Sequence, residues 1–461
     1  MTRLHYAVLT VSVCGSFLPP FMTSSVNIAL PAIQETYRHQ GIDAVLLSWV
    51  ATIYLLAAGV SLVPMGRLAD IRGRKKILGY GFALFGLCSL CCCLAPHIST
   101  LLFFRFLQGV GGGMIFSTGI AILTSVFPPD KRGRVLGIAV ATVYIGLLTG
   151  PFIGGLLVHC CGWRTLFLMI GLSCLIPWGL VLLFLDGEWM DAAGERYDVI
   201  GVAVYVPSLV GIIYGFSILP EIIGVLCLAA GSGGLVIFIV RQYRSSSPLF
   251  QVKLFVDNRV FALSCLAALI HYSATFALMF LLSLLLQYIL GFEPAAAGMV
   301  LMAQPVMMAL FSPLAGRYSD RFEPRVLSSA GLMITGGCLL ALCFVDGSTS
   351  VFSLVTILSV LGFGYALFSS PNMNAIMGSV ERKYLGVSSG AAGTMRIFGQ
   401  LFSMGIATLV LSLFIGKQPI TPAVYPELLK SIRLTFFIFS MLCLAGILAS
   451  LARGNLHQGR D

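Results

Sequence analysis

The residues of this chain that could act on a charged or polar solute lie inside long apolar stretches. Arg105 and Arg396 stand among hydrophobic residues, Gln108 follows Arg105 by one helical turn, and His271 and Asn27 have similar surroundings. An ionisable side chain inside a membrane is costly and is by default a functional hypothesis, and histidine titrates near physiological pH. These five residues are therefore candidates for lining a cavity or for coupling cargo to ions.

The two arginines leave two interpretations open. They could give a central cavity a positive character, which would favour anionic or neutral cargo over lipophilic cations. They could instead be satisfied by polar groups, and His271 could be a hydrogen-bonded structural residue. The candidate polar partners of the arginines are Asn27, Gln108, Asn372, Asn374 and Gln400.

Carboxylates are missing from these apolar surroundings. No Asp or Glu falls deep inside an apolar stretch, although a buried carboxylate is the simplest proton carrier. The chain shows no clustered set of acid, base and metal-binding groups, so an enzyme is not expected. Neither a cofactor nor a metal site is expected, because the 13 cysteines fit apolar packing. Five acids share one connecting segment: Asp186, Glu188, Asp191, Glu195 and Asp198.

A glycine-rich array with one proline occupies a single apolar stretch. Glycines at helical spacing let a second helix approach closely in lipid, where packing drives helix association. A proline in the same helix removes a hydrogen bond and bends the helix. This pattern predicts a moving or closely packed helix at Gly137, Gly146, Gly150, Pro151, Gly154 and Gly155.

A short basic loop is the second patterned segment. Its glycines suit a tight turn, and its carboxylate can face the positive N-terminus of a helix. Its basic cluster is expected to hold the loop on an anionic membrane surface. The predicted gating residues are Gly66, Asp70, Gly73, Arg74 and Lys75.

The elements that position these residues are expected to be membrane-spanning helices. The chain has 461 residues, of which 58% are hydrophobic and 10% charged, and its mean hydropathy is +0.97. Soluble domains carry about 25% charged residues, and a spanning helix needs roughly 20 apolar residues. We identify fourteen such stretches and predict an all-α polytopic membrane protein with 14 transmembrane helices.

The basic residues predict the orientation of the helices. Most of the 28 lysines and arginines fall in alternate connecting segments, and such segments face the cytoplasm. The net charge of +10 therefore needs no nucleic-acid partner. We expect a multi-pass protein of the plasma (inner) membrane with both termini cytoplasmic.

An internal repeat divides the chain. Gly66-Arg67-x-x-Asp70 recurs as Gly316-Arg317-x-x-Asp320. Parallel six-helix repeats are a transporter architecture, with the substrate site between the halves near the midplane. We expect a six-helix bundle at residues 1–185, an inserted helix pair with its linkers at 186–259, and a second six-helix bundle with a short tail at 260–461.

With these motifs, nearly the whole chain resembles the fourteen-helix drug:proton antiporter branch of the major facilitator superfamily. The glycine–proline array resembles that branch's antiporter motif on the fifth helix. The loop after Gly66 resembles the signature loop, which in the family clamps the two halves in the outward-open state. The stretch Leu101-x3-Arg105-x2-Gln108-Gly109 resembles a helix-4 motif that the family links to proton transfer. One departure stands out: the branch carries an aspartate five residues before the asparagine that matches Asn27, and here that position is Met22.

The resemblance implies a secondary-active transporter that exports hydrophobic or amphipathic small molecules by alternating access, with protons as the candidate coupling ion. Its partners would be a small-molecule substrate and the lipid bilayer, and it is expected to be a monomer. One alternative is a facilitator or exporter of anionic or neutral metabolites, without proton coupling through a helix-1 acid. The other alternative is a membrane sensor that transports nothing.

Overall fold

The computed structural model describes residues 3–40, 44–218, 221–245, 248–250, 252–292, 294–415 and 422–454. Within these ranges the regular secondary structure is helical, because only hydrogen bonding inside a segment can satisfy its backbone in lipid. Thirteen of the described helices are long and apolar enough to span a membrane, and Val199–Gly215 is a shorter apolar helix. The fourteen predicted stretches all fall on these segments, which confirms an all-α polytopic membrane fold.

The N-terminal bundle holds the first six predicted spans. α1 packs along α5, and α4 packs between α2 and α3. The sixth span is interrupted at Cys174 and comprises two short helices. The members are α1 (Arg3–Thr36), the turn η1 (Arg38–Gln40), α2 (Ala44–Arg72), α3 (Arg74–Cys93), α4 (Ile98–Val126), α5 (Pro129–Cys161), α6 (Arg164–Ser173) and α7 (Leu175–Phe184).

The C-terminal bundle holds the last six predicted spans. Its first span is broken after Ser273 and ends in a π-helical turn, and its second is broken at Met302. The members are α11 (Arg259–Ser273), α12 (Leu278–Leu284), η2 (Leu285–Ile289), α13 (Pro294–Leu301), α14 (Ala303–Ser319), α15 (Pro324–Leu342), α16 (Val351–Gly378), η3 (Arg382–Tyr384), α17 (Leu385–Phe414), η4 (Pro422–Val424) and α18 (Tyr425–Ala452).

Two inserted helices, α8 (Val199–Ser217) and α9 (Ile222–Arg244), connect the bundles, followed by the short α10 (Val252–Asp257). α8 and α9 pack closely, since a Cβ added at Gly231 would lie 2.6 Å from the carbonyl oxygen of Ser208. α8 also contacts both α2 and α17. An apolar cluster joins it to α2 through Leu56, Val60, Tyr205 and Leu209. The inserted pair therefore covers the seam between the two bundles where α2 meets α17.

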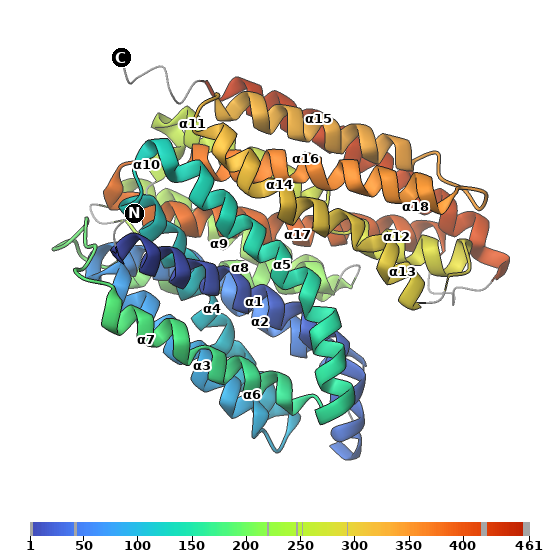
Figure 1. The fold of residues 1–461 in the computed structure, drawn as a ribbon, viewed down its shortest axis with the longest axis horizontal. Coiled ribbons are helices and arrows are strands. Elements are labelled where there is room, and N and C mark those ends of the chain that lie inside the picture. Colours follow the sequence, from blue (N-terminus) through green and yellow to red (C-terminus); the bar gives the residue numbers. More distant parts are fainter. Residues whose placement is uncertain are drawn as a thin grey trace.

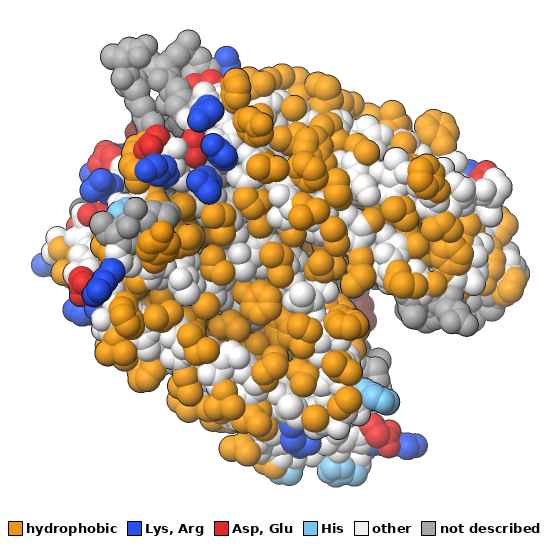
Figure 2. All heavy atoms as spheres, viewed as in Figure 1, with side chains coloured by type: hydrophobic (Ala, Val, Ile, Leu, Met, Phe, Trp, Pro, Cys, Tyr) orange, Lys and Arg blue, Asp and Glu red, His pale blue; other side chains and the backbone are white. Residues whose placement is uncertain are grey.

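The two ends of the molecule differ in charge and in packing. Figure 1 shows the helices running between two ends, with both chain termini at the same end. Figure 2 shows Lys and Arg gathered at that end and the molecule hollowed between the two bundles at the other. We call the first the basic end, which carries the α2–α3, α4–α5 and α14–α15 connections, and the second the open end. The bundle boundaries and the orientation in the membrane stay predictions.

The orientation can be tested on α5, which runs the length of the molecule. In intact cells, an impermeant maleimide should label the exposed native Cys160 and Cys161, because α5 ends there at the open end. In a Cys160→Ser/Cys161→Ser background, Lys131→Cys at the exposed start of α5 should react only after the membrane is permeabilised. Labelling of Lys131→Cys in intact cells would contradict a cytoplasmic basic end.

Candidate functional site

At the basic end, a carboxylate at the end of α2 caps a helix of the opposite bundle. Asp70 is fully buried and accepts hydrogen bonds from the backbone N–H of Gly386 (2.9 Å) and of Val387 (3.1 Å), in the first turn of α17. The first N–H groups of a helix lack intrahelical partners and carry partial positive charge. The approach requires glycine, because a Cβ on Gly66 would lie 2.3 Å from the oxygen of Gly386.

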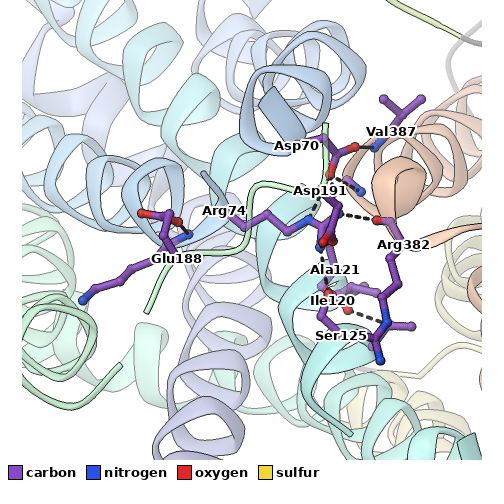
Figure 3. A network of polar contacts seen from close by, with 12 residues as sticks. Asp70, Arg74, Ile120, Ala121, Ser125, Glu188, Asp191, Arg382 and Val387 are labelled. Atoms are coloured by element: carbon purple, nitrogen blue, oxygen red, sulfur yellow. Dashed lines mark hydrogen bonds and ion pairs between the residues drawn. The ribbon is translucent and has the colours of Figure 1, made fainter. Parts of the chain in front are cut away.

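Arg74 binds several groups around this carboxylate (Figure 3). Its guanidinium donates to Asp70 Oδ1 through Nη2 (2.7 Å) and Nε (2.9 Å). It also donates to Asp191 Oδ2 (2.9 Å), to Ser125 Oγ (2.8 Å) and to the carbonyl oxygen of Arg382 (2.5 Å). The last bond crosses to the C-terminal bundle. Arg74 thus neutralises Asp70 and reinforces the same contact between the bundles.

A connecting segment between α7 and α8 lies across this site as a strap, residues 186–198. Glu188 Oε1 accepts the backbone N–H of Lys75 (2.7 Å), and Glu195 pairs with Arg67. The backbone adds two bonds, Ala192 N–H to the oxygen of Asp70 (3.1 Å) and Arg74 N–H to that of Trp189 (3.1 Å). The sequence shows these acids in one segment, but not that they bind the α2–α3 loop.

The backbone of Gly73 explains why the loop needs glycine beside the strap. Its φ is +114°, a left-handed value that favours glycine. A Cβ there would also lie 2.4 Å from the carboxyl carbon of Glu188. The ammonium group of Lys75 donates a hydrogen bond to the carbonyl oxygen of Leu185.

The expectation that the basic cluster lies on the membrane surface is wrong for two of its members. Arg74 is completely buried and Arg67 is 1% exposed. Both are drawn inward because carboxylates of the same bundle, Asp70, Asp191 and Glu195, offer them ion pairs. Arg72 and Lys76 stay exposed and available to lipid headgroups.

The strap ends at Asp198, which caps α8. Its carboxylate accepts the N–H of Gly201 (2.8 Å) and is bonded by Gln242 (2.8 Å) and Arg241 (3.2 Å) of α9. Burial alone would raise the pKa of Asp198, but these hydrogen bonds outweigh it and hold the pKa below its usual value. The carboxylate therefore ties the strap to both inserted helices in its charged form.

The sequence repeat forms a second, crossed contact at the same end. Asp320, directly after α14, accepts the N–H of Gly133 (2.5 Å) and of Arg134 (3.0 Å) in the second turn of α5. A Cβ on Gly133 would lie 2.1 Å from the oxygen of Gly316. The position that matches Arg74 is Pro324. Each bundle thus places a carboxylate against the N-terminal part of one helix of the other.

The glycine–proline array of α5 contacts two different helices. Gly137 lies against α14 of the other bundle, where a Cβ would be 2.5 Å from the oxygen of Ser312. Gly146, Gly150 and Gly154 lie against α1, with atoms of Phe17, Phe21, Ser24 and Ser25 within 3 Å of an added Cβ. Gly155 has only Ile28 at 3.7 Å, and Pro151 is exposed. The array therefore packs α5 against α1 along the half of α5 toward the open end. Toward the basic end, α5 packs against α14 instead.

Arg105 and Gln108 form one buried polar unit in the N-terminal bundle. Arg105 Nη1 donates to Gln108 Oε1 (2.6 Å) and its Nε to the oxygen of Val50 (2.9 Å). Gln108 in turn donates to Ser89 Oγ (2.6 Å), and the guanidinium lies 4.6 Å from the ring centre of Tyr54. Within the described ranges, Arg105 Nη2 alone of its nitrogens is buried without a partner. The expectation that a polar side chain satisfies this arginine holds for Gln108.

His271 and Asn27 differ in their burial. His271 is fully buried at the end of α11, its ring stacked 4.1 Å from that of Phe368 and edge-on to Tyr365. Among the described residues neither of its ring nitrogens has a hydrogen-bond partner. Asn27 is exposed on the outer part of α1. Their roles as coupling or cavity residues stay predictions.

Arg396 and Arg453 complete the set of arginines inside the C-terminal bundle. Arg396, on α17, lies 4.3 Å from the ring centre of Phe116 on α4 and so faces the other bundle. Arg453, directly after α18, is buried and donates to Asn372 Oδ1 (2.7 Å), Ser264 Oγ (3.0 Å) and Ser328 Oγ (3.1 Å). No local sequence pattern indicates this cluster, because the three acceptors of Arg453 come from three helices, α11, α15 and α16.

Comparison with known proteins adds a family match. The model of the Major Facilitator Superfamily matches residues 12–196 and 264–457 and leaves out the stretch that holds α8 and α9. The riboflavin transporter RibZ of Clostridioides difficile is 27% identical over 88% of this chain and 87% of its own length. The multidrug resistance protein Stp of Mycobacterium tuberculosis is 30% identical over 90% of this chain and 78% of its own. The crystal structure of the human organic anion transporter MFSD10 has a TM-score of 0.69 over 97% of this chain and 99% of its own, and at 15% identity it shares the fold alone.

The two crossed contacts predict how the basic end opens. Asp70→Asn and Asp320→Asn each remove a charge that faces a helix N-terminus, an interaction worth about 0.3–2 kcal/mol. Spin labels at Lys76→Cys and Glu381→Cys, exposed residues of opposite bundles, should then show a larger population of long distances by double electron–electron resonance. Asp346→Asn, the same change in a turn at the open end, is the matched control. Unchanged distances in both variants would argue against gating by these carboxylates.

The array on α5 predicts which glycines tolerate a methyl group. Gly146→Ala should lower the thermal stability of the purified protein, because its Cβ would lie 2.7 Å from the backbone oxygen of Phe17 and overpacking costs about 1–3 kcal/mol. Gly155→Ala, in the same helix and motif, should be neutral or slightly stabilising. Equal melting temperatures for the two variants would contradict close packing of α5 on α1.

Proposed function

The chain belongs to the Major Facilitator Superfamily, and we propose that it is a secondary-active transporter that exports hydrophobic or amphipathic small molecules by alternating access. We place it in the plasma membrane with the basic end in the cytoplasm. The observation that carries the proposal is the pair of crossed carboxylate contacts at the basic end, combined with the hollow at the open end. This arrangement corresponds to an outward-open state of the cycle.

The alternation follows from how few polar bonds hold the basic end. In the opposite bundle, Asp70 accepts two N–H groups of the first turn of α17, and Asp320 accepts two N–H groups of the second turn of α5. Such bonds are local to one helical turn, so rocking of the bundles can break them without unfolding a helix. Breaking both would open the basic end, and closure of the opposite end would complete the exchange.

Two features support amphipathic cargo. The aromatic residues Phe116 and Tyr144 of the N-terminal bundle contact Arg396 and Ser369 of the other bundle, and the family relatives include one named for multidrug resistance. The riboflavin transporter among the relatives shows that cargo differs between members at this level of identity. The direction of transport is therefore proposed from the resistance protein and not from the fold.

A second candidate is a facilitator or exporter without proton coupling. Within the described ranges every acidic side chain lies at a helix end or in a connecting segment. Met22, which takes the place of the family's helix-1 aspartate, is fully buried among apolar residues. In the described part of the chain, no carboxylate thus lies deep inside a spanning helix to carry the proton.

Transport in proteoliposomes tests the function. Purified protein should move an anionic naphthalene sulfonate down its gradient, and an imposed pH gradient should accelerate accumulation if protons are coupled. A short reducible dithiol cross-link between Lys131→Cys and Arg321→Cys, exposed residues beside the Asp320 contact, should stop transport, and reduction should restore it. The single variants treated with the same reagent are the controls. Movement that survives cross-linking would contradict alternating access.

A further inference from the structure

Arg396 lies deep between the two bundles. It follows Gly386, whose N–H binds Asp70 at the basic end, by ten residues of one continuous helix. At 1.5 Å per residue this is about 15 Å, half of a hydrocarbon core roughly 30 Å thick. Its contact with Phe116 points it toward the N-terminal bundle. Arg396 is therefore a midplane charge at the surface that the bundles share.

Arg396 lies against an aromatic ring, and no carboxylate of the described part of the chain forms an ion pair with it. Its charge acts on the phenols of Tyr54 and Tyr144, which come from α2 and α5 of the other bundle. Tyr144 Oη lies 3.0 Å from Ser369 Oγ. Among the residues that the structure describes, Arg396 has no ion pair and no hydrogen-bond partner. The ring of Phe116 offers only partial compensation for a guanidinium charge away from water.

The other arginines within the bundles show that the chain can satisfy such charges itself. Arg105 donates to Gln108 and Val50, and Arg453 donates to three side chains. Both are fully or nearly fully buried, whereas Arg396 is partly exposed. Arg396 is thus the intramembrane arginine whose donors remain available on the surface between the bundles. A charge kept there at a cost is a functional hypothesis by default.

We propose that Arg396 binds the anionic group of the cargo, a carboxylate or sulfonate, while the apolar body of the cargo packs on Phe116 and the neighbouring tyrosines. The planar guanidinium can hold such a group through two parallel hydrogen bonds. The cargo class is then small amphipathic organic anions, and permanent cations are excluded because Arg396 places a positive charge beside Phe116 there. The proposal rests on the proposed function in one respect, that the space between the bundles receives cargo.

Three probes on one aromatic body test the inference without requiring transport. Naphthalene-2-sulfonate, naphthalene-2-sulfonamide and 2-naphthyltrimethylammonium differ in charge and share the ring. Equilibrium dialysis against the full-length protein in lipid nanodiscs should give at least about tenfold tighter binding of the sulfonate than of the other two, as expected for a charge-assisted bond in apolar surroundings. Equal binding of the three probes to the wild type would overturn the proposal, whatever any variant does.

Substitutions then assign the preference to one side chain. Arg396→Gln should remove the preference for the sulfonate and leave binding of the sulfonamide unchanged. Arg396→Lys should retain part of the preference, since it keeps the charge and loses the paired geometry. Lys430→Gln, the same change at an exposed position of the open end, controls for long-range charge. A preference that survives in Arg396→Gln would refute the role of this residue.

The outcomes separate this inference from the proposed function. If the sulfonate binds through Arg396 and yet no probe crosses the membrane of proteoliposomes, the transport proposal fails and the binding site stands. If the protein transports the neutral and cationic probes as well as the sulfonate, transport stands and the anion site fails.

Discussion

The structure depends on one electrostatic arrangement, a carboxylate placed at the N-terminus of a helix that belongs to the other bundle. Asp70 supplies an acceptor to two N–H groups in the first turn of α17, which lack partners within the helix, and Asp320 accepts two N–H groups in the second turn of α5. In lipid the hydrophobic effect does not hold helices together, so polar contacts and close packing decide how the bundles meet. The glycine pairs Gly66–Gly386 and Gly133–Gly316 allow that approach, because a single Cβ would lie within 2.4 Å of the facing backbone.

The sequence could predict the elements and the motifs because each follows from a local pattern. Apolar length predicted the spans, and the repeated Gly-Arg-x-x-Asp motif predicted two related halves. The pattern of the loop also predicted that Asp70 faces the N-terminus of a helix. The identity of that helix was not, because Gly386 and Asp70 are brought together only by the packing of α2 on α17.

Long-range partners account for most of what the sequence could not predict. In the sequence, Asp191 and Glu195 are two of five acids in one connecting segment. In the structure they form ion pairs with the buried Arg74 and Arg67. Arg453 was not among the candidate residues, yet three helices, α11, α15 and α16, supply the polar groups around it. In each case the charge of the residue was evident and its partner lay more than eighty positions away, where no periodicity or spacing rule reaches.

The two contacts also differ in what remains when they separate. Arg74, Asp191 and Ser125 belong to the N-terminal bundle or its strap, as Asp70 does. When α17 moves away, Asp70 loses two N–H donors but keeps its ion pair, so no bare carboxylate is left in apolar surroundings. Asp320 has Pro324 where Arg74 would stand, but it is only half-buried, so water can replace the donors of α5. Each carboxylate therefore has a substitute for its lost partner, which lowers the cost of opening the basic end while leaving the closed arrangement specific.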